Sequence, residues 1–355
     1  LLEPSRINAI NYSNDYTLWS NTQFTINSNS VTSPQGITNG TKIVPSTSNT
    51  EKSLDIGGFV RTSGQYISHS VYAKASGYNF LYISNSASRL YAVYDLQQGL
   101  VIYSNSNGTD FNNHSASIEL FGNGWYRCKL IGQAQSSVGS YFRISCGANA
   151  VNSSTAGLFE GDGTSGIEVY GSQVELNASY ETSYIPTNGA IATRLAESAN
   201  VTGLSGVFGS SSSTAFLEID IPPSGSLSTT GVWPLTAATD ISNFISVCQF
   251  DSGSTTPRIA LYIGGAAIID QYLSTPLSAG THKVCLAYED GRQKLFIDGF
   301  EELSLTASFN YVEFTKLSIN DTAWALGNNG GPYSNKQTAV FPTALTDSEC
   351  IALTS

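Results

Sequence analysis

The chain has 355 residues, of which 41% are hydrophobic and 12% are charged, with 33 Gly and a formal net charge of −11. This length predicts two domains at roughly 100–200 residues each, and the low charge with many glycines favours all-β domains rich in turns. Residues 1–195 have 10 Lys and Arg against 12 Asp and Glu (net −2) and residues 196–355 have 6 against 15 (net −9), so neither half has the basic excess that nucleic acid or an anionic membrane requires.

Three further features of the whole sequence limit the interpretation. No run of 18 apolar residues is present, so no membrane insertion is expected. The chain begins at Leu1 and contains no Met, so we expect it to be the C-terminal part of a longer polypeptide or a processed product. The five Cys residues, odd in number and without zinc-site spacing, are expected to be small buried thiols and not a disulfide framework.

The first half reads as a series of short strands in chain order. The stretch Arg89–Ser104 contains two apolar runs around Gly99, and Ser115–Ala134 contains two more around Asn123, which is flanked by glycines. Asn and Gly tolerate the positive φ that tight hairpin turns need. Because no run in this half has helical periodicity, the pattern predicts a β-sandwich over residues 1–195.

The composition changes around residues 196–204, where small, polar and Gly residues predominate. We predict that this segment is a linker. The strand pattern then resumes, and residues 205–355 predict a second sandwich. Its clearest hairpin, His282–Glu301, turns at Asp290-Gly291. Near the end, Thr346 and Glu349 form a capping-box pattern before an apolar run, which predicts one short C-terminal helix.

The stretch "STAFLEIDIPP" (Ser213–Pro223) places Glu218 and Asp220 on one face of a predicted strand. It resembles the E-x-D-x-(x)-E strand of the laminarinase and lichenase group of glycosidases. A retaining glycosidase needs two carboxyl groups about 5–5.5 Å apart, and Pro222 stands where the second Glu should be. The three histidines fit no catalytic motif either, so we expect no enzymatic activity.

Two stretches of the first half resemble a known family. The opening "LLEPSRINAINYSNDYTLW" and the closing "YGSQVELNASYETSYIPTNGAIATR" are similar to the start and end of carbohydrate-binding-module-like jelly-roll domains of tailed-phage fibres and tailspikes. The resemblance spans nearly all of residues 1–195. It implies a jelly roll whose motif residues are structural, with aromatic rings in the core at Trp19, Trp125 and Tyr184 and backbone-shaping positions at Gly171 and Pro186.

The second half resembles the concanavalin A-like or laminin G-like group. The hairpin "HKVCLAYEDGRQKLFIDGFE" (His282–Glu301) is similar to its central hairpin, and "VFPTALTDSECIAL" (Val340–Leu353) to the closing helix of phage copies. The fold class expected for the whole chain is therefore all-β, with a jelly roll followed by a concanavalin A-like sandwich.

Lectin-like sandwiches bind sugars in loops, with an aromatic ring against the sugar face and amides on its hydroxyls. The loop Asn320–Lys336 best fits this chemistry. Its candidate ligand-binding residues are Trp324, Tyr333, Asn328 and Asn329. The alternative is an ordinary rim loop with Trp324 packed inward.

Two weaker candidates remain. Tyr91 and Tyr94 are alternative sugar-binding rings in the first half, against a core role for both. Asp321 is the one candidate ligand for Ca²⁺, the one cofactor that the sequence suggests, and its alternative role is an Asx-turn.

The function that the two resemblances imply is a non-catalytic virion protein at the phage surface that binds glycans on a host or in the environment. Its other expected partners are virion proteins and further copies of itself, as a trimer. The first alternative is a purely structural virion module that acts as a spacer or docks to capsid or tail proteins. The second is a fragment of a polysaccharide depolymerase.

Overall fold

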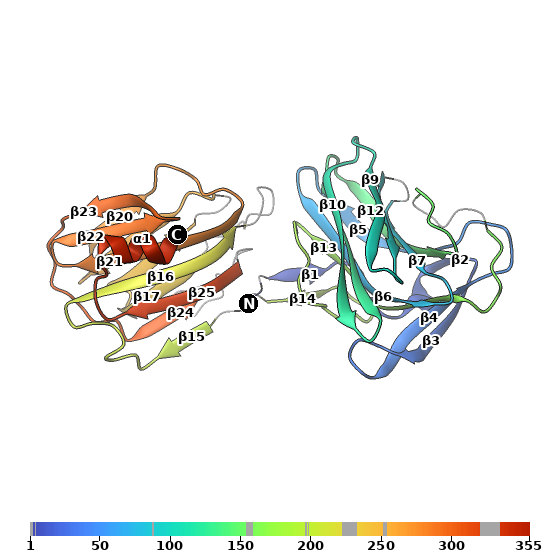
Figure 1. The fold of residues 1–355 in the computed structure, drawn as a ribbon, viewed down its shortest axis with the longest axis horizontal. Coiled ribbons are helices and arrows are strands. Elements are labelled where there is room, and N and C mark those ends of the chain that lie inside the picture. The colour runs from blue at the N-terminus through green and yellow to red at the C-terminus, as the bar shows by residue number, and fades with distance from the viewer. Residues whose placement is uncertain are drawn as a thin grey trace. The chain divides into compact units, whose positions relative to one another are not determined.

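The structure is a computed structural model, and it describes residues 3, 5–86, 89–153, 159–195, 197, 199–221, 233–250, 254–319 and 334–355. The chain forms two compact units (Figure 1). The first comprises Arg6–Arg194, and the second comprises Leu195–Ser355 together with Leu1–Ser5. Apart from one short α-helix and a 3-10 turn, the described elements are strands, so the predicted all-β class is confirmed.

The first unit is a sandwich of two antiparallel sheets. The larger sheet has the order β10 (Phe111–Gly122), β11 (Trp125–Ala134), β6 (Tyr66–Ser76), β13 (Gly166–Leu176), β1 (Arg6–Asn8) and β14 (Ala192–Arg194), with β4 (Thr38–Pro45) paired to β13 and β3 (Phe24–Thr32) paired to β4. The smaller has the order β2 (Ser20–Thr22), β5 (Ser53–Arg61), β12 (Val138–Gly147), β7 (Phe80–Asn85), β8 (Leu90–Asp95) and β9 (Leu100–Ser106). A 3-10 turn, η1 (Tyr16–Leu18), precedes β2.

The two predicted hairpins of this unit are confirmed. Gly99 has a φ of 69° in the turn between β8 and β9, and Asn123 has a φ of 52° in the turn between β10 and β11. Both turns therefore use the left-handed backbone that Gly and Asn adopt at low cost.

The two tryptophans and the glycine of the motifs are structural, as the resemblance implied, whereas the role of Pro186, which is exposed, stays a prediction. Trp19 and Trp125 are buried, and their indole nitrogens donate to the backbone oxygens of Tyr12 and Thr32. Gly171 has a φ of 61°, and a Cβ there would lie 3.2 Å from the ring of Tyr72. Only glycine combines this backbone conformation with so close a ring.

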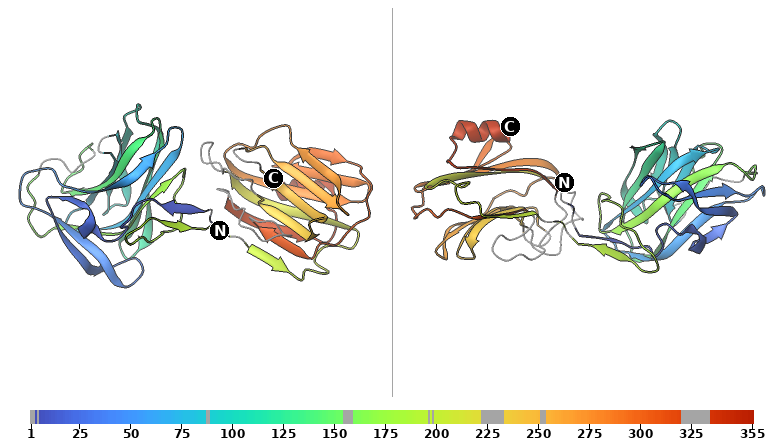
Figure 2. Two further views of the ribbon diagram at one scale, coloured as in Figure 1. Left: turned by 180° about the vertical axis from the view of Figure 1, so that it is seen from behind. Right: turned by 90° about the horizontal axis from the view of Figure 1, so that it is seen from below.

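The second unit is also a two-sheet sandwich, and Figure 2 (right) shows its sheets face to face. The larger sheet has the order β15 (Ala199–Thr202), β24 (Lys316–Ile319), β17 (Leu235–Asp240), β18 (Asn243–Gln249), β19 (Arg258–Ile263) and β20 (Ala266–Tyr272). The smaller has the order β23 (Phe300–Leu305), β22 (Arg292–Ile297), β21 (Gly280–Glu289), β16 (Ser212–Ile221) and β25 (Ser334–Phe341).

The predicted C-terminal helix is α1 (Asp347–Thr354), and its capping box is complete. The Thr346 side chain accepts from the backbone N–H of Glu349, and the Glu349 carboxylate accepts from the backbone N–H of Thr346. Cys350 of α1 packs with Cys285 and Phe296 in a small core on the outer face of the smaller sheet. No described helix is long and apolar enough to cross a bilayer.

The structure corrects the predicted linker at 196–204. Within it, β15 pairs with β24 of the second unit, and the backbone N–H of Leu204 donates to the carbonyl of Thr315. The small polar residues were interpreted as a linker, but backbone pairing needs no particular side chain, so a short strand fits there. The five Cys residues are free and buried, which confirms that prediction.

His69 is a fully buried histidine in the core of the first unit. Its Nδ1 lies 3.4 Å from the carbonyl oxygen of Leu130, and its Nε2 lies 3.0 Å from the Asn85 amide nitrogen. A neutral ring that donates from Nδ1 and accepts at Nε2 satisfies both contacts. Burial lowers the pKa of His69 to about 4, so the ring stays neutral in the folded protein well below pH 6.5.

We predict that this histidine makes the first unit sensitive to acid. The unfolded chain takes up a proton near pH 6.5 and the folded chain near pH 4, so the free energy of unfolding falls as the pH falls between these values. The loss approaches roughly 3 kcal/mol at pH 4. Urea unfolding of wild type and His69→Gln at pH 7.5, 5.5 and 4.5 measures it. The free energy of unfolding should fall less with falling pH in the variant than in wild type. An equal fall in both proteins would contradict the prediction.

Candidate functional site

The site begins with a buried polar network in the closing motif of the first unit. Gln173 and Glu175 on β13 are fully buried. The Glu175 carboxylate accepts from the Thr182 backbone N–H at 2.9 Å and from the Thr182 hydroxyl at 2.5 Å, while Gln173 Oε1 accepts from the Ile185 backbone N–H at 2.6 Å. Burial raises the pKa of Glu175, and the Thr182 hydrogen bonds oppose that rise.

The opening motif completes this network and fixes the segment that follows. The Asn8 amide nitrogen donates to the carbonyl of Ile185 at 2.8 Å. Ser13 Oγ accepts from the Thr187 backbone N–H at 2.8 Å and lies 2.6 Å from the Tyr184 hydroxyl. The two ends of the unit, distant in sequence, are therefore held side by side near Thr187.

A bulge in β3 brings a third segment to the same place. The ladder between β3 and β4 loses register between Asn27 and Val31, and Asn29 within the gap has a φ of 50°. A bulge re-aims side chains that a regular strand would keep in the ladder. Here the re-aimed residues include Ser28 and Asn29.

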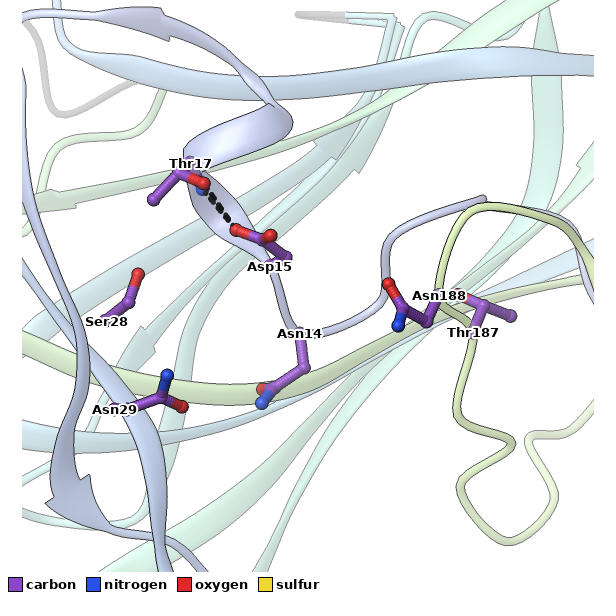
Figure 3. Close-up of a pocket in the computed structure, with 7 residues that line it drawn as sticks. All are labelled: Asn14, Asp15, Thr17, Ser28, Asn29, Thr187 and Asn188. Atoms are coloured by element: carbon purple, nitrogen blue, oxygen red, sulfur yellow. Dashed lines mark hydrogen bonds between the residues drawn. The ribbon is translucent and has the colours of Figure 1, made fainter.

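These three segments line a pocket of about 410 Å³, the candidate functional site. Its lining residues are Asn14, Asp15, Thr17, Ser28, Asn29, Thr187 and Asn188. Figure 3 shows β3 on the left, the turn that leads into η1 in the middle and the segment with Asn188 on the right, with the Asn14 and Asn29 amides turned toward each other. The lining residues carry three amides, three hydroxyls and one carboxylate.

Some of these groups are committed to the fold. The Asn14 side chain donates to the Asn39 carbonyl at 2.8 Å and accepts from the Gly171 backbone N–H at 3.2 Å. Asp15 Oδ1 accepts from the backbone N–H and the hydroxyl of Thr17. These bonds hold the turn rigid and leave the second carboxylate oxygen of Asp15 for other donors.

One lining group has no described partner although it is buried. The Thr187 hydroxyl makes no hydrogen bond to the described part of the protein, and Thr187 is 8% exposed. A buried hydroxyl without a partner costs free energy. The groups that the pocket presents to a ligand are the exposed amides of Asn29 and Asn188, which is chemistry suited to a polyhydroxylated ligand.

Most of the sequence-predicted site residues lie outside the described part of the chain. They are Asp321, Trp324, Asn328, Asn329 and Tyr333, and Pro222 lies outside it as well. Their assignment to a sugar loop, a Ca²⁺ ligand and a strand end stays a prediction. Among the described residues, no group of three or more His, Cys, Asp and Glu side chains could hold a metal ion.

Tyr91 and Tyr94 need a correction, because neither presents its ring to solvent. They lie three residues apart on β8 and so point to opposite faces. Tyr94 is fully buried between the sheets, with its hydroxyl bonded to the Lys129 carbonyl, and Tyr91 packs with Tyr82 on the outer face. The core alternative holds for both.

Glu218 and Asp220 do share a face of β16, as predicted, while Leu217 and Ile219 face the core between the sheets. The two acids lie on the outer face, the same face as Phe216, which packs near α1. Asp220 accepts from the Thr281 hydroxyl at 3.0 Å and pairs with Lys336 at 3.6 Å. Glu218 and Asp220 therefore lie on a partly exposed face of the sheet, where the Lys336 ammonium group pairs with Asp220.

One described constellation superficially looks catalytic. His282 Nδ1 lies 2.6 Å from the Asp298 carboxylate, and its Nε2 lies 3.5 Å from Ser278 Oγ. Nε2, however, lies 2.9 Å from the Ser278 carbonyl oxygen, which only accepts. A general base needs a lone pair on Nε2 facing the hydroxyl. Because Nε2 lies closer to the Ser278 carbonyl oxygen than to its hydroxyl, we interpret this trio as a contact that fixes the loop.

A second pocket, of about 470 Å³, lies beside α1 and includes Glu289, Arg292 and Asp347 among its lining residues. Arg292 bonds Asp347 at 2.8 Å and lies 3.6 Å from Glu289. Both acids are already paired with Arg292, so the pocket of the first unit, whose carboxylate has no ion-pair partner among the described residues, is the stronger candidate.

Sequence reasoning missed this pocket although most of its residues lie in the two quoted motifs. Asn14, Asp15 and Thr17 belong to "NYSNDYT", and Thr187 and Asn188 belong to "IPTN". The sequence feature that could have indicated the pocket is the alternation of polar residues with core residues in both motifs. Ser28 and Asn29 had no sequence signal, because a bulge depends on the register between two strands.

Comparison with known proteins found distant structural likenesses. No family model and no curated protein match the sequence. Similar solved structures include the CBM40 domain of the Ruminococcus gnavus IT-sialidase (13% identity, TM-score 0.35, 42% of this chain and 86% of that chain) and CG-16, a homodimeric agglutinin from chicken liver (13%, 0.29, 41% and 99%). A botulinum neurotoxin type C structure, whose title reports interaction with two ganglioside molecules, is also similar (11%, 0.34, 46% and 40%).

These neighbours are carbohydrate-binding and lectin-like β-sandwich domains. Each likeness covers less than half of this chain, and the match to the toxin spans 40% of that protein. Likenesses of this size carry no argument about what this chain binds.

We predict opposite effects of two matched substitutions in the closing motif. Thr182→Val removes a hydroxyl that bonds the buried Glu175 carboxylate, and should lower the free energy of unfolding by about 2 kcal/mol. Thr187→Val replaces a buried hydroxyl with no described partner by a methyl group and should raise the free energy of unfolding by up to about 1 kcal/mol. Urea unfolding of the two variants measures both. Equal losses would contradict this account of the network.

Proposed function

We propose that this chain is a non-catalytic glycan-binding protein whose sugar site is the pocket of the first unit. The observation that carries the proposal is that the opening and closing motifs converge on one pocket whose lining residues carry amides, hydroxyls and a single carboxylate. Such groups recognise sugar hydroxyls through directional hydrogen bonds. The two motifs also resemble those of phage carbohydrate-binding modules, which supports the same ligand class.

The proposal extends to where the protein works. We propose that it is displayed on a tailed-phage virion as part of a fibre or decoration protein and that it assembles as a trimer. A pocket without an aromatic ring among its lining residues binds one sugar weakly. Several copies on one fibre would raise the overall affinity by multivalency.

A structural module is the second candidate, because one observation favours it. Gln173 and Glu175, the polar residues of the closing motif, are fully buried and serve the fold. Such a motif can recur in a family for stability alone, with the two sandwiches acting as a spacer or docking to other virion proteins.

The proposal predicts that two pocket substitutions reduce glycan binding. Asn188→Ala and Asn29→Gly each remove an exposed amide, and glycine retains the positive φ of position 29. On a glycan array probed with the full-length oligomeric protein, each should weaken binding about tenfold. The matched control Asn123→Gly makes the same change at a hairpin turn with a φ of 52° and should bind as wild type.

Two outcomes would contradict the proposal. If folded wild-type protein binds no glycan, the structural module becomes the better account. If glycans bind to wild type and neither pocket variant weakens this binding, the protein binds sugar at another site. A parallel array with a chelator shows whether Ca²⁺ takes part.

A further inference from the structure

The charge of the pocket limits which sugars it accepts, and this inference rests on the function proposed above. Among its seven lining residues, Asp15 is the one charged residue, and none is Lys, Arg or His. Carboxylated sugars are recognised by cationic or strong donor groups, most effectively by a bidentate arginine. The lining set offers an anion instead.

The Asp15 charge is not neutralised by the described protein. Asp15 is exposed, and its described hydrogen bonds come from Thr17, which is uncharged. No ion pair involves Asp15 among the described residues, since the described ion pairs of the first unit use other acids. The pocket therefore presents a net negative charge to whatever enters.

Most basic side chains of the first unit are bound to other groups. Those held by carboxylates or by backbone oxygens are Arg6, Lys52, Arg61, Lys74, Arg89, Arg127, Lys129, Arg143 and Arg194. Lys42 lies on β4 in cross-strand register with Asn27 and with Glu168 of β13, and it does not line the pocket. With residues 1–195 at net −2, no surrounding positive field offsets Asp15.

The hydrogen-bonding groups suit an uncharged, hydroxyl-rich ring. The exposed amides of Asn29 and Asn188 each donate and accept, and the Asp15 carboxylate accepts. Neighbouring hydroxyls of a hexose donate and accept in the same way, so they can satisfy these groups in pairs. A carboxylate on the ring would only accept, and would face the like charge of Asp15.

We infer that the pocket of the first unit selects neutral sugars and rejects acidic ones, with Asp15 as the specificity-determining residue. Asp15 acts by accepting hydrogen bonds from sugar hydroxyls and by repelling carboxylates. Uronic acids and sialylated sugars belong to the rejected class.

The test compares two ligands that differ in one group. Full-length protein is titrated by isothermal calorimetry with an oligosaccharide that ends in glucose and with the same oligosaccharide ending in glucuronic acid, where CH₂OH is replaced by COO⁻. If an array shows that another neutral hexose binds better than glucose, that hexose and its corresponding uronic acid replace this pair. We expect the neutral ligand to bind at least tenfold tighter at low salt.

Asp15→Asn is the decisive variant. Asn accepts at the same Oδ1 position and is as good a cap, so the turn before Thr17 is retained. The preference for the neutral sugar should fall below about threefold in the variant, and in wild type it should shrink with added salt. Asp162→Asn, a matched change at another Asx-type turn, should leave the preference unchanged.

The outcomes distinguish a failure of the proposed glycan binding from a failure of the proposed selectivity for neutral sugars. If neither ligand of any pair binds, the proposed function fails and this inference with it. If the acidic ligand binds as tightly as the neutral one, or if Asp15→Asn leaves the preference unchanged, the inference about charge is overturned while glycan binding stands.

Discussion

The first unit depends on the hydrogen bonds that the buried Glu175 and Gln173 side chains make to the segment that follows β13. That segment contains no described strand before β14, so its backbone groups need partners within the sandwich. Glu175 and Gln173 bind the backbone N–H groups of Thr182 and Ile185. Because this segment also provides Thr187 and Asn188, the pocket exists only where the buried network holds it in place.

The described part of the second unit is a similar sandwich with different surface chemistry. Its acids on β16 point to the outer face of the sandwich, with Lys336 beside Asp220, and His282 lies between the Asp298 carboxylate and the Ser278 carbonyl. The helix α1 packs against that same sheet with a buried Cys350. These described groups of the second unit are explained by packing and surface pairing, whereas the first unit has a pocket lined by exposed amides and by the Asp15 carboxylate.

Hydrophobic alternation and turn residues were enough to predict the two sandwiches, the hairpins at Gly99 and Asn123 and the helix after Thr346, because each follows from local chemistry. The strand at Ala199–Thr202 was missed, because its pairing with β24 depends on residues more than a hundred positions away. The strand that contains Tyr91 and Tyr94 was predicted correctly. The burial of their rings was not, because it depends on which distant residues pack against each face of that strand.

The pocket was not predictable for the same reason, since it joins three segments that meet only in the folded unit. The most direct test of the account is a ¹⁵N TROSY titration of the full chain with a neutral oligosaccharide that binds on the array. The account predicts shifts concentrated at Asn14–Thr17, Ser28, Asn29 and Thr187–Asn188. Shifts confined to the second unit, or none at concentrations where the array shows binding, would contradict it.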